Sequence, residues 1–134
     1  MDNVLPFLAR TTLKILSLAV YFTCLDRKGG VFDTDKFIWL QGREVWMFSM
    51  LYNKVEKRQE WLDCAVQGGE FLKKYGHDGN YNWYFSLDRS GRPLVEPYNI
   101  FSYTFATMAF GQLSLATGNQ EYADIAKKTF EIIF

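Results

Sequence analysis

The sequence has few of the side chains that most often bind metal ions. It contains one histidine, His77, and two cysteines, Cys24 and Cys64, which lie far apart and have no CxxC spacing. Because a protein metal site needs several such ligands together, we expect no metal. Both cysteines are predicted to be reduced, partly buried thiols. His77 stands in the turn-like segment YGHDGN and is predicted to be an exposed loop residue.

An excess of charge of one sign is also missing. Fifteen basic and fifteen acidic residues cancel, and neither kind forms a block, whereas a nucleic-acid-binding protein usually carries a basic patch. The apolar run at residues 13–20 is too short to span a bilayer and lacks the cleavage site of a signal peptide. We therefore expect a cytoplasmic protein of at most one domain that binds neither nucleic acid nor membrane.

What the sequence does have is an internal repeat. The segments YFTCLDRKGG and YFSLDRSGRP each predict a short β-hairpin with a polar tip. Their leucines, Leu25 and Leu87, are 62 positions apart, and the same offset aligns Trp39 with Phe101. The segment EWLDCA is matched by EYADIA 61 positions later. Matches at several places in the same order indicate a repeated structural unit.

Hydrophobic periodicity predicts two kinds of helix in each repeat. Residues 38–53 and 100–117 are apolar on nearly every face, which predicts inner helices buried all round. One-sided apolar stripes at residues 61–72 and 122–133 predict outer helices, the first ending near Gly76. An inner helix, an outer helix and a hairpin per repeat are typical of an α/α toroid. The alternative is a plain helical bundle, which the hairpins disfavour because bundle connections are usually short.

One charged pair, Arg43 and Glu44, interrupts the first inner helix. Burying a guanidinium without a partner is costly, and arginine cannot lose its charge. We therefore expect Arg43 to face either an internal carboxylate or the open mouth of the toroid. Adjacent helical positions do not share a face, so Glu44 is expected to point elsewhere. Trp39 precedes Arg43 by one turn and is expected to share its face.

Four motifs occur in a characteristic order: FDTDKFIWLQGREVWMFSMLYN, YFSLDR-G-PL, PYNIFS-FA-MAFGQ and ATGN-EYADIA. With them, the sequence from position 21 onward resembles the N-acylglucosamine 2-epimerase family, also called renin-binding proteins. The resemblance implies an all-α fold, an (α/α)6 barrel with short β-hairpins between helix pairs. Residues 1–134 would form the N-terminal part of that single domain, with the later helices absent.

The resemblance also implies an activity, the interconversion of N-acetylglucosamine and N-acetylmannosamine by proton transfer at C2, without a cofactor. Three alternatives stay open: an aldose–ketose isomerase, a cellobiose 2-epimerase relative, and a non-catalytic truncated protein that binds a partner. The expected partner is thus a small-molecule sugar.

The resemblance assigns site residues as well. Arg43 matches the arginine of the family's WLQGR-type motif, which implies a catalytic and sugar-binding role near the reacting carbons. Trp39 would form an apolar wall for the sugar ring, with core packing as the alternative. Tyr98, Asn99 and Ser102 would hydrogen-bond sugar hydroxyls at the start of the second inner helix, although Asn99 could equally cap that helix.

The sequence departs from the family in its extent. The family's two catalytic histidines lie on later inner helices and His77 matches neither, so the chain by itself is expected to be inactive. An open barrel edge is also expected to cause self-association. The side chains expected to be partly bare there are Trp39, Trp46, Phe101, Phe105 and Phe110.

A second departure lies at residues 8–20, where the family usually has a charged stretch that ends in Gly-Gly. Codons can be chosen for residues 11–20 that, read two bases on, spell NNSKDFEFGG. Our hypothesis is a compensated pair of frameshifts, which genomic DNA sequencing would test.

Overall fold

The computed structural model describes Tyr21, residues 24–97 and residues 100–134. Residues 8–20, Tyr98 and Asn99, on which predictions were made, therefore lie outside the described residues. The elements in chain order are β1 (Cys24–Leu25), β2 (Val31–Asp33), β3 (Lys36–Phe37), α2 (Ile38–Lys54), α3 (Gln59–Tyr75), β4 (Ser86–Leu87), β5 (Pro93–Val95), α4 (Phe101–Thr117) and α5 (Gln120–Ile133).

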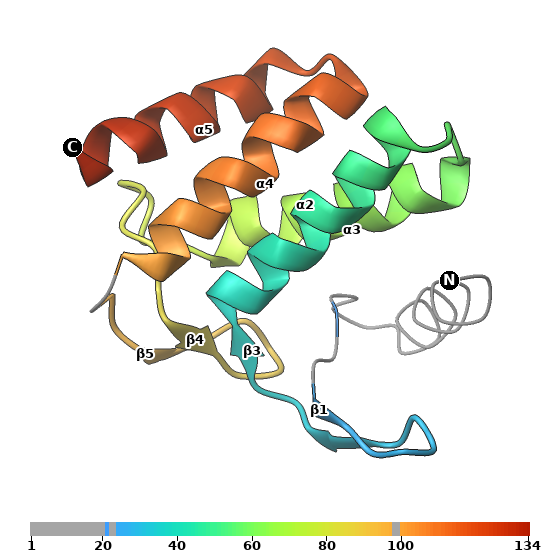
Figure 1. The fold of residues 1–134 in the computed structure, drawn as a ribbon. Helices are drawn as coiled ribbons and strands as arrows, with labels where there is room; N and C mark the ends of the chain where they lie inside the picture. The colour runs from blue at the N-terminus through green and yellow to red at the C-terminus, as the bar shows by residue number, and fades with distance from the viewer. Residues whose placement is uncertain (1–20, 22–23, 98–99) are drawn as a thin grey trace.

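The inner helices α2 and α4 form where the continuous apolar runs predicted them, and each bound agrees to within one residue. Figure 1 shows them side by side, with α3 packed against α2 and α5 against α4. Gly42 permits their close approach, because a Cβ atom there would lie 3.0 Å from the carbonyl oxygen of Phe105. Further along, the Asn53 side-chain amide donates to the carbonyl oxygen of Gln112 at 3.0 Å. The two helices thus pack directly, as neighbouring inner helices of a toroid do.

The outer helices α3 and α5 bury one stripe each, as their periodicity predicted. Gly76 follows the last residue of α3, at the predicted end. Gly118 ends α4 in the left-handed conformation, with φ of 69°, which glycine adopts without strain. Asn119 then caps α5, because its side-chain oxygen accepts the N–H of Glu121 at 2.9 Å. The short GNQ segment thereby reverses the chain between α4 and α5.

The core lies between the inner and outer helices. Its fully buried side chains include Val45, Phe48, Leu72, Phe110 and Leu113. Trp83, from the segment after α3, is also fully buried, and its indole N–H donates to the hydroxyl of Thr129 at 3.1 Å. This bond ties the connection between the two repeats to the last helix.

Both predicted hairpins are present. β1 pairs with β2 and β4 with β5, each antiparallel. In both turns an aspartate, Asp26 or Asp88, accepts the backbone N–H groups two and four positions later through its Oδ1 atom. The two turns have the same internal hydrogen bonding, which confirms the structural repeat.

One strand was not predicted. β3 pairs with β4, with Lys36 opposite Leu87, and extends the second hairpin to a three-stranded sheet. The first backbone N–H of α2, that of Ile38, donates to the carbonyl oxygen of Phe85 at 3.0 Å. Since Phe37 provides no side-chain cap, this carbonyl satisfies one of the free N–H groups at the start of α2.

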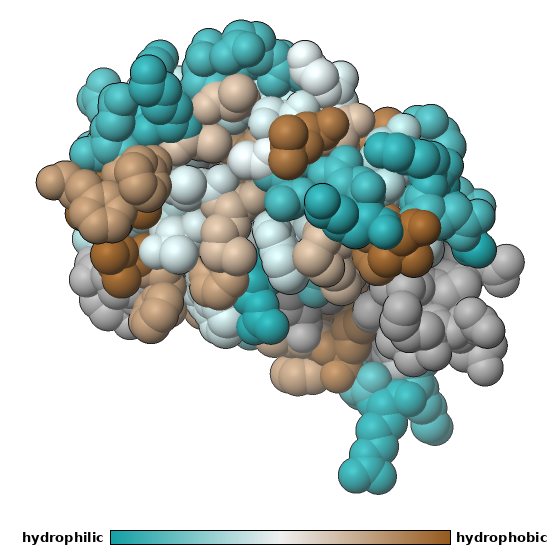
Figure 2. Space-filling view, turned by 45° about the horizontal axis from the view of Figure 1, so that its top comes forward, coloured by the Kyte–Doolittle hydropathy of each residue, from teal (hydrophilic) through white to brown (hydrophobic). Residues whose placement is uncertain are grey.

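The second inner helix is not buried all round. Phe101, Met108 and Leu115, spaced by seven residues on one face of α4, are 59%, 38% and 71% exposed. Figure 2 likewise shows hydrophobic side chains reaching the surface among hydrophilic ones. The prediction that Phe110 would be partly bare is wrong, because Phe110 points toward the outer helices and packs against the rings of Trp83 and Tyr122, both at 5.8 Å.

No helix in the described part of the chain is long and apolar enough to cross a membrane. Within the same residues, no group of three or more His, Cys, Asp or Glu side chains is placed to hold a metal ion. Both cysteines are free thiols, Cys24 half-buried and Cys64 buried. Burial raises the pKa of the Cys64 thiol to about 11, so this thiol stays protonated and unreactive near neutral pH.

Candidate functional site

The candidate site is centred on Arg43, whose side chain is exposed in the middle of α2. Its guanidinium carbon lies 5.8 Å from the ring centroid of Trp39, which confirms that the two residues share a face. Across residues 24–97 and 100–134, no carboxylate forms an ion pair with Arg43 within 4.0 Å. Arg43 is therefore exposed to solvent rather than paired with a described carboxylate, and its position at the mouth of the toroid stays a prediction.

A second aromatic ring contacts Arg43 from the neighbouring helix. Phe105 of α4 has its ring centroid 5.8 Å from the guanidinium carbon. The rings of Trp39 and Phe105 are 6.2 Å apart and tilted by 45°. From the sequence, Phe105 was predicted only to lie at the open barrel edge, and this contact was not predicted. The repeat offset of 62 makes Arg43 and Phe105 equivalent positions, but equivalence between repeats does not predict that two residues touch.

A pocket of about 260 Å³ lies beside Arg43, lined by Leu40, Arg43, Glu44, Trp46 and Met47. Glu44 forms no ion pair with Arg43 within 4.0 Å among the described residues, as expected of adjacent helical positions, although both residues line this pocket. Burial raises the pKa of the Glu44 carboxyl, and the positive charge of Arg43 opposes that rise. The pocket thus combines an apolar wall with one fixed positive charge and one partly desolvated carboxyl group.

Ser102 is not among the residues that line the pocket beside Arg43. It is buried in the first turn of α4, on the face that also carries the fully buried Ala106 and Ala109. Sugar binding by Ser102, Tyr98 and Asn99 therefore stays a prediction, the last two lying outside the described residues.

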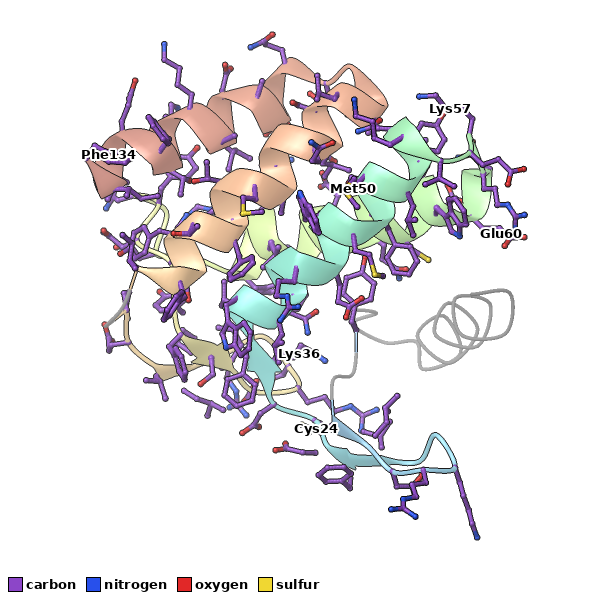
Figure 3. All side chains as sticks on the ribbon, viewed as in Figure 1. Cys24, Lys36, Met50, Lys57, Glu60 and Phe134 are labelled. Atoms are coloured by element: carbon purple, nitrogen blue, oxygen red, sulfur yellow. The ribbon has the colours of Figure 1, made fainter. Side chains whose placement is uncertain are left out.

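Lys36, the first residue of β3 and two positions before α2 (Figure 3), is a buried titratable group that was not predicted from the sequence. Burial lowers the pKa of its ammonium group to about 8, and the positive charge of Arg89 adds to that effect. A single lysine in a two-residue strand gives no periodic signal, so its burial could not be read from the sequence.

His77 is half-buried, so the prediction of an exposed loop residue is wrong. Its ring stacks on Tyr81 and lies against Trp83, both at 4.8 Å between centroids. Its Nδ1 atom accepts the backbone N–H of Gly79 at 3.0 Å. Burial lowers the pKa of His77, while a backbone hydrogen bond to Lys73 and the charge of Asp78 oppose that shift.

Comparison with known proteins places this geometry in a family. The family model for N-acylglucosamine 2-epimerase (GlcNAc 2-epimerase) matches residues 21–134. The chain is 42% identical over 117 residues to the N-acylglucosamine 2-epimerase of Bos taurus, covering 84% of this chain and 28% of that protein. It is 44% identical over 106 residues to the Homo sapiens protein of the same name, covering 76% and 25%. The chain thus spans about a quarter of the length of these curated relatives.

Solved structures of sugar epimerases have a similar fold. A sugar epimerase from a ruminal bacterium superposes with a TM-score of 0.87 at 26% identity, over 98% of this chain and 33% of that one. The cellobiose 2-epimerase of Bacillus thermoamylovorans gives 0.86 at 28%, over 98% and 34%. The helix pairs therefore form part of an (α/α)6 barrel, as the repeat and the resemblance predicted. From its motifs, its repeat and these matches, the chain belongs to the N-acylglucosamine 2-epimerase family.

Proposed function

We propose that this chain is part of a sugar 2-epimerase in which Arg43 binds the reacting end of the sugar. The proposal rests on the charge, the exposure and the contacts of Arg43. It is a permanent positive charge on the open side of an inner helix, held between two rings and unpaired with any described carboxylate within 4.0 Å. A guanidinium that is not already neutralised is free to bind an anionic oxygen.

An N-acylglucosamine ranks first as the substrate. Curated relatives named N-acylglucosamine 2-epimerase are 42% to 45% identical to the chain, whereas those named cellobiose 2-epimerase are 28% to 30% identical. Cellobiose is the second candidate, supported by the superposition on a solved cellobiose 2-epimerase. An aldose–ketose isomerase is a further alternative, because it passes through the same kind of enediolate.

The proposed reaction requires removal of the C2 proton from an open-chain sugar and its return on the opposite face. Loss of that proton leaves negative charge on the C1 oxygen, which Arg43 would stabilise by about 3 kcal/mol, as oxyanion donors do. The general base and general acid are proposed to come from later inner helices of the barrel. Trp39 would supply an apolar wall for the sugar ring.

We also propose that residues 1–134 are the N-terminal part of a single barrel domain and are inactive alone. The partial coverage of relatives supports this. The exposed apolar face of α4 supports self-association of the isolated chain through the open edge. The free thiols of Cys24 and Cys64 support a cytoplasmic location, which cell fractionation would test.

The deciding experiment measures deuterium exchange at C2 of N-acetylmannosamine in D2O by the complete gene product. Arg43→Lys is expected to lower kcat about 100-fold, because lysine keeps the charge but lacks the planar fork. Arg27→Lys, an exposed arginine in the first hairpin turn, is the matched control and is expected to keep full activity. Normal kinetics in Arg43→Lys with a lowered Tm would instead assign Arg43 a structural role.

A further inference from the structure

The two aromatic contacts of Arg43 come from two different inner helices. Trp39 lies on α2, one turn before the arginine, and Phe105 lies on α4. Each ring centroid is 5.8 Å from the guanidinium carbon, within the distance at which a cation is attracted to a ring face. A long flexible side chain that touches only one ring can swing about its stem. Contact with a second ring on another helix removes much of that freedom.

The backbone around Phe105 is itself fixed. Gly42, directly before Arg43, lies so close to α4 that an added Cβ would be 3.0 Å from the carbonyl oxygen and 3.1 Å from the Cβ atom of Phe105. The two helices therefore meet at this turn, and Phe105 starts from a backbone position pressed against α2. The ring reaches Arg43 from a rigid crossing rather than from a loop.

Few other groups are placed to orient the guanidinium. In the described ranges it has no carboxylate partner within 4.0 Å. Glu44 lines the same pocket, and burial raises the pKa of its carboxyl group. The rings of Trp39 and Phe105 are therefore the described contacts that set the direction of the charge.

We propose that Phe105 is a positioning residue, which holds the guanidinium of Arg43 against Trp39 so that its charge points to one place on the open side of the inner helices. The effect on catalysis rests on the proposed function of Arg43, whereas the effect on the geometry of Arg43 does not. Phe105 contacts no reacting atom in this scheme and acts only through the arginine.

The test compares Phe105→Leu, which removes the ring but keeps an apolar side chain, with Phe105→Tyr, which keeps the ring. Phe130→Leu is the matched control, because Phe130 is an exposed phenylalanine on α5. The structural readout is the NMR signal of the Arg43 Nε–H group in arginine-labelled protein, assigned by its loss in Arg43→Lys. Ring currents are expected to shift this signal upfield in the wild type, in Phe105→Tyr and in Phe130→Leu. Phe105→Leu is expected to lose much of that shift.

The kinetic readout is epimerisation by the complete gene product. Phe105→Leu is expected to lower kcat about fivefold, equivalent to about 1 kcal/mol, with a smaller change in KM. Phe105→Tyr keeps the ring and should therefore keep the wild-type kcat. A general packing defect would instead lower kcat in both Phe105 variants.

The outcomes separate the two proposals. An Arg43 signal without an upfield shift in the wild type overturns the positioning role, even if Phe105→Leu fails to fold. The same holds for a shift that persists in folded Phe105→Leu. A shift lost in Phe105→Leu while its kcat stays normal supports the positioning of Arg43 and removes the catalytic role proposed for that arginine.

Discussion

The two inner helices place different side chains at equivalent positions of the repeat. The offset of 62 residues pairs Trp39 with Phe101, Arg43 with Phe105 and Trp46 with Met108. On α2 these positions hold two indole rings and a charge: Arg43 and Trp46 line an open pocket, and Trp39 lies against Arg43. On α4 they hold apolar side chains, two of which are largely or partly exposed.

Positions that face the outer helices behave differently. Phe48 and Phe110 are also equivalent, and both are fully buried aromatic side chains, 1% and 0% exposed. The repeat therefore keeps the packing surface between inner and outer helices and varies the opposite surface. A fold of this kind can alter its chemistry on one side of each inner helix without changing the contacts that hold the helix in place.

The largest effect should come from breaking the shared packing surface. Phe48→Ala and Phe110→Ala are each expected to lower the free energy of unfolding by about 3–5 kcal/mol, because each leaves a cavity in the core. Urea denaturation followed by circular dichroism measures both. A gap of more than about 2 kcal/mol between the two variants would contradict the structural equivalence of the repeats.

The next effect concerns the crossing of α2 and α4. Gly42→Ala is expected to lower the free energy of unfolding by about 1–3 kcal/mol, because the new methyl group meets the backbone of Phe105, which cannot rotate away.

Gly111→Ala on α4 is the matched control, since an added Cβ there meets nothing within 4 Å. It should raise the free energy of unfolding by about 0.5–1 kcal/mol, the usual gain for alanine over glycine in a helix. Equal effects of the same sign in both variants would show that α2 and α4 do not pack as closely as described.

A third prediction addresses the exposed face of α4. Replacing Phe101 and Leu115 with serine should weaken self-association of the isolated chain about tenfold, because the pair presents much of the apolar surface on that face. Light scattering over a dilution series measures the association. Phe32→Ser, which removes an exposed phenylalanine from β2, should leave association unchanged, and an equal loss in that control would place the contact elsewhere.

The smallest expected effect is the change that pH makes to the free energy of unfolding through His77. Because burial holds the pKa of His77 below its ordinary value of 6.5, the unfolded chain takes up a proton at a higher pH than the folded chain. The contribution of His77 to the free energy of unfolding is therefore fully present above about pH 6.5 and is lost as the pH falls through the pKa of the folded state. Denaturation at several pH values between 5 and 8 should show this slope, and His77→Gln should remove it. NMR titration of the single histidine provides a direct check.

Much of the fold could be predicted from local sequence pattern. The inner helices were placed correctly because a long, mostly apolar run with turn residues at its ends leaves few alternatives. The hairpins were found because the Leu-Asp-Arg segments occur twice. β3 was missed because two residues, Lys36 and Phe37, cannot show a strand periodicity, and their pairing depends on a segment far along the chain.

The site was only partly predictable for the same reason. The shared face of Trp39 and Arg43 follows from helical geometry, so the sequence was sufficient. The contact with Phe105 and the burial of His77 depend on packing between elements. Periodicity along one helix contains no information about which residue of another helix it meets.

The carbonyl of Phe85 that accepts the Ile38 N–H has a consequence for how the chain folds. α2 begins without a side-chain cap, so its first turn is completed by backbone from the segment that leads into the second repeat. The first inner helix cannot reach its full stability until that later segment is in place. Formation of the two repeats is thereby coupled, and hydrogen exchange at the start of α2 should report the opening of the β4–β5 hairpin rather than fraying of the helix alone.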